Sequence, residues 1–134
     1  MNNLLDKEPV KRVEKVLAQF DQSIKIQILD KTARTAEDAA ESLKTEVGSI
    51  VKSLLLRTKT SFLLCLVAGD KRCSLNKVKK LLNQKDVSMA NAEQVKEITG
   101  FTIGGVSPVG HINKIDIYID ESLKRFVNIF AAAG

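Results

Sequence analysis

The sequence predicts an α/β fold, a single domain in which helices surround a mixed, strongly curved or barrel-like β-sheet. Helical and alternating hydrophobic patterns are interspersed along the chain, and most of the connections between them are short turns. No linker, internal repeat or low-complexity segment divides the 134 residues. The hydrophobic content of 44% is sufficient for one core at this length.

The first part of the chain predicts two helices and a strand between them. Apolar residues recur at helical spacing through Lys7–Phe20, which predicts an amphipathic helix. Ile24–Asp30 alternates apolar and polar residues and is predicted to be a half-buried strand. Thr35 begins a capping-box pattern with Asp38, which predicts a short helix that extends through Leu43.

A β-hairpin is predicted next. Ser49–Arg57 and Ser61–Ala68 are strand-like and are separated by a short polar turn, so we expect them to pair in antiparallel fashion. The second strand is apolar on both faces, as is typical of a central strand.

Lys52 is a candidate functional residue because of its position in the first of these strands. Strand alternation puts its side chain on one face with Ile50, Leu54 and Leu56. Removing an unpaired ammonium group from water costs several kcal/mol. The alternative is an edge-strand lysine that reaches solvent and deters edge pairing.

The second half of the chain predicts two more helices and three strands. Ser74 is a helix cap, and the helix that follows is expected to bury Leu75, Val78, Leu81 and Leu82. A second helix is capped at Asn91 and ends at Gly100. The other predicted elements are short strands at Val87–Met89, Ile115–Asp120 and Phe126–Phe130 and a helical turn at Glu121–Arg125.

Gly104–Gly110 is the second candidate functional segment. Three glycines and a proline in this stretch predict a loop of fixed shape, in which main-chain N–H groups approach a ligand closely. We expect this loop and Lys52 to form two walls of one site. The alternative is a turn that Pro108 merely stiffens.

Charge favours a polyanionic partner. Lys and Arg number 21 against 16 Asp and Glu, which gives a formal net charge of +5. The densest basic cluster contains Lys71, Arg72, Lys77, Lys79 and Lys80. The sequence leaves two interpretations open for this cluster, a docking surface for an RNA backbone and a solvated helix face.

The sequence lacks the residues that several other functions require. Aromatic residues make up only 4%, too few for a platform that stacks nucleic-acid bases. Cys65 and Cys73 fit neither a CxxC metal pair nor a disulfide framework, and the single histidine, His111, excludes a zinc site built on several histidines. No phosphate-binding glycine motif, membrane-length apolar run or signal sequence is present. We therefore expect a cytoplasmic protein that uses no cofactor and no membrane.

Five short motifs occur in the order and spacing of one known family. They are Thr35-Ala-Glu-Asp-Ala-Ala40, Ile50-Val-Lys-Ser-Leu54, Val67-Ala-Gly-Asp-Lys-Arg72, Thr99-Gly-Phe101 and Gly104-Gly-Val-Ser-Pro-Val-Gly110. From about Thr32 onward the chain closely resembles the YbaK/prolyl-tRNA-synthetase-associated domain family.

The resemblance implies that residues 1–134 form one aminoacyl-tRNA deacylase domain, without the C-terminal segment with which the family usually continues. Such a domain hydrolyses the ester of a mischarged tRNA for translational quality control, with no metal. The implied cargo is a small amino acid such as Ala, Ser, Thr or Cys on tRNA charged by prolyl-tRNA synthetase. The implied partners are the mischarged tRNA and that synthetase.

The resemblance also implies the site residues. Lys52 is the residue required for activity, and the glycine-proline loop lines the aminoacyl pocket. Ser53 occupies a position of pocket selectivity at which some members have Asn. The candidate substrate-binding residues are Thr35, Ser53, Gly104, Gly105, Val106, Ser107, Pro108 and Gly110.

Two functions of different classes follow from these residues. In a hydrolase, an ester that is already labile needs only a positioned water and polarisation of its carbonyl, which loop N–H groups and Lys52 would supply. In the alternative, the same fold is a non-catalytic module that binds tRNA or the synthetase. A zinc-dependent editing hydrolase of the alanyl type would need several His and Cys ligands that this chain lacks.

Overall fold

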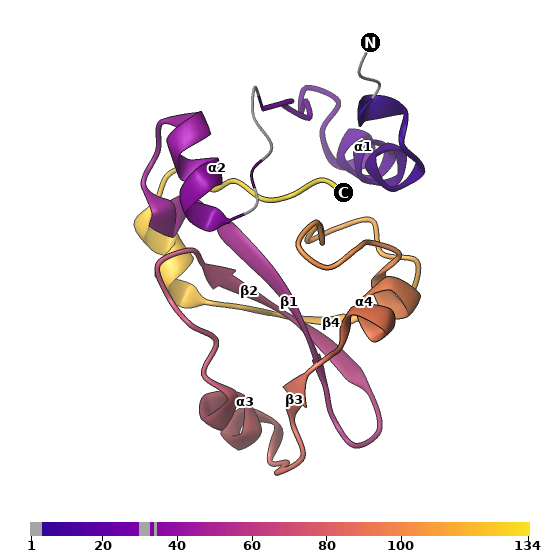
Figure 1. Cartoon of the computed structure of the whole chain (residues 1–134), viewed down its shortest axis with the longest axis vertical. Helices are drawn as coiled ribbons and strands as arrows, with labels where there is room; N and C mark the ends of the chain where they lie inside the picture. Colours follow the sequence, from indigo (N-terminus) through magenta and orange to yellow (C-terminus); the bar gives the residue numbers. More distant parts are fainter. Residues whose placement is uncertain (1–3, 30–32, 34) are drawn as a thin grey trace.

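The structure is a computed structural model that describes residues 4–29, 33 and 35–134. A twisted sheet runs through the domain, with α1, α2 and the loop before β4 gathered toward one end and α3 at the other (Figure 1). The helices are α1 (Glu8–Phe20), α2 (Ala36–Leu43), α3 (Leu75–Leu82) and α4 (Ala92–Thr99), and three 3₁₀ segments are η1 (Leu4–Asp6), η2 (Val47–Ser49) and η3 (Glu121–Arg125). The strands are β1 (Val51–Arg57), β2 (Phe62–Ala68), β3 (Ser88–Met89) and β4 (Asp116–Ile119).

The sheet is mixed, as the sequence predicts, and its strand order in the described residues is β3-β1-β2-β4. The predicted hairpin is confirmed, since β1 and β2 pair in antiparallel fashion from Val51 opposite Ala68 to Arg57 opposite Phe62. β4 joins the other edge of β2 in parallel, and β3 pairs with the end of β1.

The two faces of the hairpin bury different clusters. On one face, Leu55 and Leu64 pack with residues of α1, α4 and the loop before β4, among them the fully buried Phe101. On the other face, Leu56, Cys65 and Val67 pack against α3. Burial of each large apolar side chain contributes about 1.5 to 3 kcal/mol, so both faces help to hold the sheet.

The helix ends follow the predicted capping residues. The Thr35 hydroxyl accepts a hydrogen bond from the Asp38 N–H at 3.0 Å, and Asn91 and Gln94 form a complete capping box. Gly100 ends α4 with a left-handed φ of +81°. Within the described ranges, no helix has the length and apolar character needed to cross a membrane.

The predicted strand at Ile24–Asp30 is wrong for residues 24–29, which adopt no regular strand, and Asp30 lies outside the described residues. The outer edge of β1 is instead taken by segments from later in the chain. Val51 N–H donates to the carbonyl of Phe130 at 2.7 Å, and the carbonyl of Leu55 accepts from the Ala90 N–H at 3.0 Å. The alternating segment therefore has no ladder to join there.

Two smaller expectations also fail. The predicted strand at Phe126–Phe130 reduces to one bridge between Ile50 and Phe130, while Val127 is fully exposed. Leu81 was expected to face inward but is 72% exposed. An eight-residue helix at the edge of the fold buries only part of its apolar stripe, here Val78 most completely.

Candidate functional site

A cavity of about 1240 Å³ lies between β1, α1 and the glycine loop, by which we mean Gly104–Gly110. Gly69 and Phe130 also border it. The structure brings most of the predicted site residues to this cavity, namely Thr35, Lys52, Ser53, Gly104, Gly105, Val106, Ser107 and Pro108.

Gly110 is the predicted pocket residue that is not among the described residues lining the cavity. It packs against α1, because a Cβ atom at Gly110 would lie 3.3 Å from the N and Cα atoms of Val13. Its carbonyl accepts a hydrogen bond from Arg12 Nε at 3.0 Å. Gly110 therefore anchors the loop to α1.

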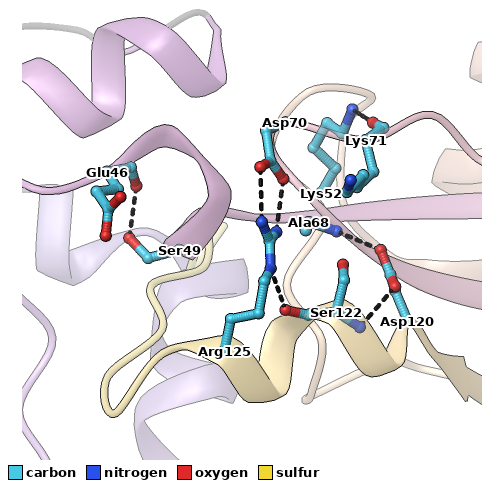
Figure 2. Close-up of polar contacts among 9 residues, drawn as sticks. All are labelled: Glu46, Ser49, Lys52, Ala68, Asp70, Lys71, Asp120, Ser122 and Arg125. Carbon is cyan, nitrogen blue, oxygen red and sulfur yellow. Dashed lines mark hydrogen bonds and ion pairs between the residues drawn. The ribbon is translucent and has the colours of Figure 1, made fainter.

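Lys52 lies near the start of β1, directly opposite Val67 of β2. This places its side chain on the predicted face, with Leu56, and not on the face that packs against Val106. Its Nζ atom donates a hydrogen bond to the main-chain carbonyl of Lys71, in the turn after β2 (Figure 2). Lys52 and the glycine loop border one cavity, but the ammonium group is held at that turn.

An ion pair with η3 fixes the turn that holds Lys52 (Figure 2). Arg125 donates to both carboxylate oxygens of Asp70, at 2.8 and 2.9 Å. The hydrogen bond from Arg125 is the largest of the causes that lower the pKa of Asp70. A Cβ atom at Gly48 would lie 3.0 Å from each partner, so the pair also packs against η2. No sequence pattern indicates this pairing, because the partners lie far apart in the chain.

Internal hydrogen bonds use some of the main-chain donors of the glycine loop. The Gly105 N–H donates to the Thr102 carbonyl at 2.9 Å, and the Val109 N–H donates to Ser107 Oγ at 3.1 Å. Pro108 has no N–H. Three other residues of the loop, Gly104, Val106 and Ser107, line the cavity. Their N–H groups donate no hydrogen bond within the described part of the chain.

Two of these free donors belong to buried residues. Val106 is 6% exposed and Ser107 is fully buried. A buried N–H without a partner is rare in folded proteins, since it costs about as much as a lost hydrogen bond. Beside a cavity, such donors are suited to an anionic or carbonyl oxygen of a ligand.

The hydroxyl groups at the cavity differ in availability. Thr35 Oγ1 caps α2, and Ser107 Oγ accepts from within its own loop, so both serve the fold. Ser53 Oγ is buried and has no hydrogen-bond partner among the described residues. Of the three, the Ser53 hydroxyl is therefore the one whose donor and acceptor sites are all free in the described part of the chain.

None of the predicted RNA-contacting residues is among the described residues that line the cavity. Lys71 and Arg72 are exposed in the turn after β2, and Lys77 and Lys80 are exposed on α3, whereas Lys79 is half-buried. The ion pairs of the described residues are Arg12–Glu8, Arg57–Asp86 and Arg125–Asp70, none of which neutralises this cluster. The structure therefore leaves the cluster positively charged and accessible from solvent.

The cysteines and potential metal ligands are not arranged for catalysis or metal binding in the described residues. Burial, and next to it the neighbouring Cys73, raises the pKa of Cys65 to about 12, so its thiol stays protonated. Residues 4–29, 33 and 35–134 contain no group of three His, Cys, Asp or Glu that would hold a metal ion.

His111 is part of the loop structure. Its Nε2 lies 2.7 Å from the Ser107 carbonyl, to which it donates as the Nε2–H tautomer, and its ring packs edge-on against Phe101. Burial is the main cause that lowers the pKa of His111, and the charge of Arg12 also lowers it, while the bond to Ser107 opposes the shift. His111 is thus neutral near pH 7.

We expect His111 to make stability depend on pH in the acidic range. Because its pKa is lower in the folded state than the ordinary 6.5, the unfolded chain takes up the proton first as the pH falls. Neutral His111 therefore makes its full contribution to the free energy of unfolding above pH 6.5, and this contribution decreases as the pH falls below 6.5. Urea unfolding of the wild type and His111→Gln from about pH 5 to about pH 8 measures this loss. Parallel pH profiles for the two proteins would contradict the expectation.

Comparisons with known proteins identify the family and the fold. The family model for the aminoacyl-tRNA editing domain matches residues 30–134. A crystal structure of a candidate trans-editing enzyme for prolyl tRNA synthetase superposes with a TM-score of 0.83 and 37% identity, over 90% of this chain and 76% of that one. This similarity confirms the predicted fold.

Sequence relatives fall into two groups by length. The uncharacterized protein YwhH of Bacillus subtilis (strain 168) is 32% identical over 126 residues, which is 93% of this chain and 80% of YwhH. The proline--tRNA ligase of Bacillus velezensis is 36% identical over 101 residues, which is 75% of this chain but only 18% of the ligase. The chain thus corresponds to a small part of the ligase, and it belongs to the aminoacyl-tRNA editing domain family, as its motifs predict.

Proposed function

We propose that this chain is an aminoacyl-tRNA deacylase. It cleaves the ester between a wrong amino acid and the terminal ribose of tRNA, with water as the nucleophile, and it needs no metal. The products are the free amino acid and a tRNA with its hydroxyl restored. Its place of action is the cytoplasm, and its second partner is prolyl-tRNA synthetase.

One observation carries the proposal. Lys52 borders the same cavity as Val106 and Ser107, two buried residues whose N–H groups donate no hydrogen bond in the described part of the chain. As water attacks the ester carbonyl, negative charge develops on the carbonyl oxygen. Preorganised N–H donors stabilise such an oxyanion by about 2.7 to 4 kcal/mol each in well-studied hydrolases.

Lys52 supplies positive charge at the same cavity. Its described partner is the neutral carbonyl of Lys71, so no carboxylate in the described residues cancels the ammonium charge. An oxygen of the terminal ribose, phosphate or ester could replace this carbonyl as the partner of the ammonium group. The lysine would then keep a hydrogen bond, and its positive charge would act on the substrate. This step converts a folding contact into a substrate contact.

The proposed cargo is a small amino acid, Ala, Ser, Thr or Cys, on the tRNA that prolyl-tRNA synthetase charges. The support for it is family membership and the similarity to proline--tRNA ligases. Ser53 is the proposed contact for the amino-acid side chain, since its buried hydroxyl has bonding capacity to spare. A difference of one methylene would be discriminated by only about 1 to 3 kcal/mol.

A panel of tRNAs mischarged with Ala, Ser, Thr or Cys, together with correctly charged prolyl-tRNA, tests the function. Release of a small amino acid at catalytic protein concentration, with prolyl-tRNA spared, is the expected result. Binding of the charged tRNAs without release would instead support the non-catalytic module. The contact between Lys52 and the Lys71 carbonyl is the observation that favours this second candidate, because it gives the lysine a role in the fold.

The basic cluster gives a separate prediction, in which Lys71, Arg72, Lys77, Lys79 and Lys80 contact the tRNA backbone. The double variant Lys77→Glu, Lys80→Glu should raise KM and leave kcat unchanged, because no described residue of α3 borders the cavity. The dependence of log KM on log salt should become shallower by about 1 for each phosphate that the variant no longer neutralises. Lys96→Glu, on the exposed side of α4, is the matched control. An unchanged salt dependence would mean that these lysines are a solvated helix face.

A further inference from the structure

One guanidinium group joins the two ends of the glycine-rich segment. Arg12, in α1, donates from Nη2 to the Gly100 carbonyl and from Nε to the Gly110 carbonyl, both at 3.0 Å. The same group lies 4.9 Å from the ring centroid of Phe101. We call Gly100, Phe101 and Gly110 the loop neck, since they flank the segment that carries the free N–H donors.

The backbone of the neck fits this side chain closely. Gly100 and Gly110 have left-handed φ angles of +81° and +80°, which favour glycine. A Cβ atom at Gly100 would lie 2.6 Å from Arg12 Nη2. The guanidinium is planar and has five N–H donors in a fixed fork, so it can bridge two carbonyls that a single ammonium point charge would not span.

Arg12 itself is held in place from α1. Its Nη1 pairs with Glu8 one turn earlier, and the neighbouring Val13 is buried in the same cluster as Phe101 and Val106. The stretch that matches the editing-domain family begins at residue 30, so α1 lies before it. A residue outside the matched stretch thus donates hydrogen bonds to both ends of a loop inside it.

We propose that Arg12 is a positioning residue for the editing reaction. It holds the loop neck closed, so that the N–H groups of Gly104, Val106 and Ser107 keep one arrangement toward the cavity. This inference rests on the proposed deacylase function. Arg12 is not among the described residues that line the cavity, so it acts through the loop and not on the substrate.

The kinetic test compares Arg12→Lys and Arg12→Ala with the wild type, using the mischarged tRNA that the panel identifies. We expect kcat to fall by about tenfold to a hundredfold, the range expected when reacting groups are displaced by about 1 Å, with little change in KM. Arg12→Lys should fail to restore the rate, although it keeps the positive charge. Lys11→Ala, an exposed lysine on the same helix, is the matched control and should leave kcat unchanged.

Two further measurements separate positioning from stability. Val78→Ala removes a buried side chain of α3 on the other face of the sheet, so it should lower the unfolding midpoint without lowering kcat. Amide hydrogen exchange of Gly105 and Val109, whose N–H groups donate hydrogen bonds within the loop, should be at least about tenfold faster in Arg12→Ala than in Lys11→Ala.

The outcomes are distinct. If the wild type is active but Arg12→Ala retains its kcat and its loop exchange rates, the role of Arg12 is overturned while the deacylase function stands. A loss of kcat in Val78→Ala as large as in Arg12→Ala would also overturn it, since stability alone would then account for the effect. If the wild type releases no amino acid from any tRNA, the proposed function fails, and with it the catalytic meaning of Arg12.

Discussion

Lys52→Ala should lower kcat for release of the amino acid by about 10²- to 10³-fold, the effect of losing one group that stabilises transition-state charge. The expected cause is the loss of the positive charge of Lys52, a residue that borders the cavity. Because the ammonium group contacts a neutral carbonyl, its removal breaks no ion pair in the described residues. Single-turnover deacylation of the mischarged tRNA measures the effect on chemistry without product release.

Two variants separate charge from packing at this position. Lys52→Met keeps most of the aliphatic stem beside Val67 and should be as inactive as Lys52→Ala. Lys59→Ala, in the exposed turn between β1 and β2, should behave like the wild type. If Lys52→Met retained full activity, the ammonium group of Lys52 would serve the fold through the Lys71 carbonyl and would not be a catalytic group.

Phe101→Ala should lower the free energy of unfolding by about 3 to 5 kcal/mol, the cost of removing a fully buried Phe side chain. The ring is 0% exposed and lies in the cluster that joins α1, α4 and the glycine loop. The same change removes the surface on which the Arg12 guanidinium rests. Urea unfolding monitored by circular dichroism measures the loss.

Phe20→Ala is the matched control, because it removes the same atoms from a side chain that is 87% exposed at the end of α1. Its effect should stay within about 0.5 kcal/mol. Similar losses for the two variants would show that the cluster around Phe101 does not stabilise the domain.

The elements that the sequence predicted correctly are those with local signals. Hydrophobic periodicity and the capping residues Thr35, Ser74 and Asn91 locate α2, α3 and α4, and the short polar turn locates the hairpin. These patterns depend on neighbours in the chain, so no tertiary information is needed to interpret them. The strand predicted at Ile24–Asp30 is wrong for residues 24–29, because a strand also needs a partner and Phe130 and Ala90 occupy the edge of β1.

The sequence predicted which residues meet at the cavity but not the contacts that they make there. The motif residues identified the loop and Lys52, and the structure places both at one cavity. The Lys71 carbonyl that holds Lys52 carries no sequence signal, since every residue has a carbonyl. Arg12 was missed because its Glu8 pairing looks like ordinary helix surface chemistry, and only the folded loop brings Gly100 and Gly110 to it.

The parallel pairing of β4 with β2 has a consequence for the order of folding. The hairpin joins near neighbours in the chain, whereas Leu63 reaches its partner Asp116 only after α3, α4 and the glycine loop have been traversed. Closing such a long connection costs chain entropy before the new contacts repay it. Since η3 follows β4 directly and supplies Arg125 to Asp70, the support beneath Lys52 is completed late. We therefore expect a nascent chain to form its hairpin well before the turn that holds Lys52 is fixed.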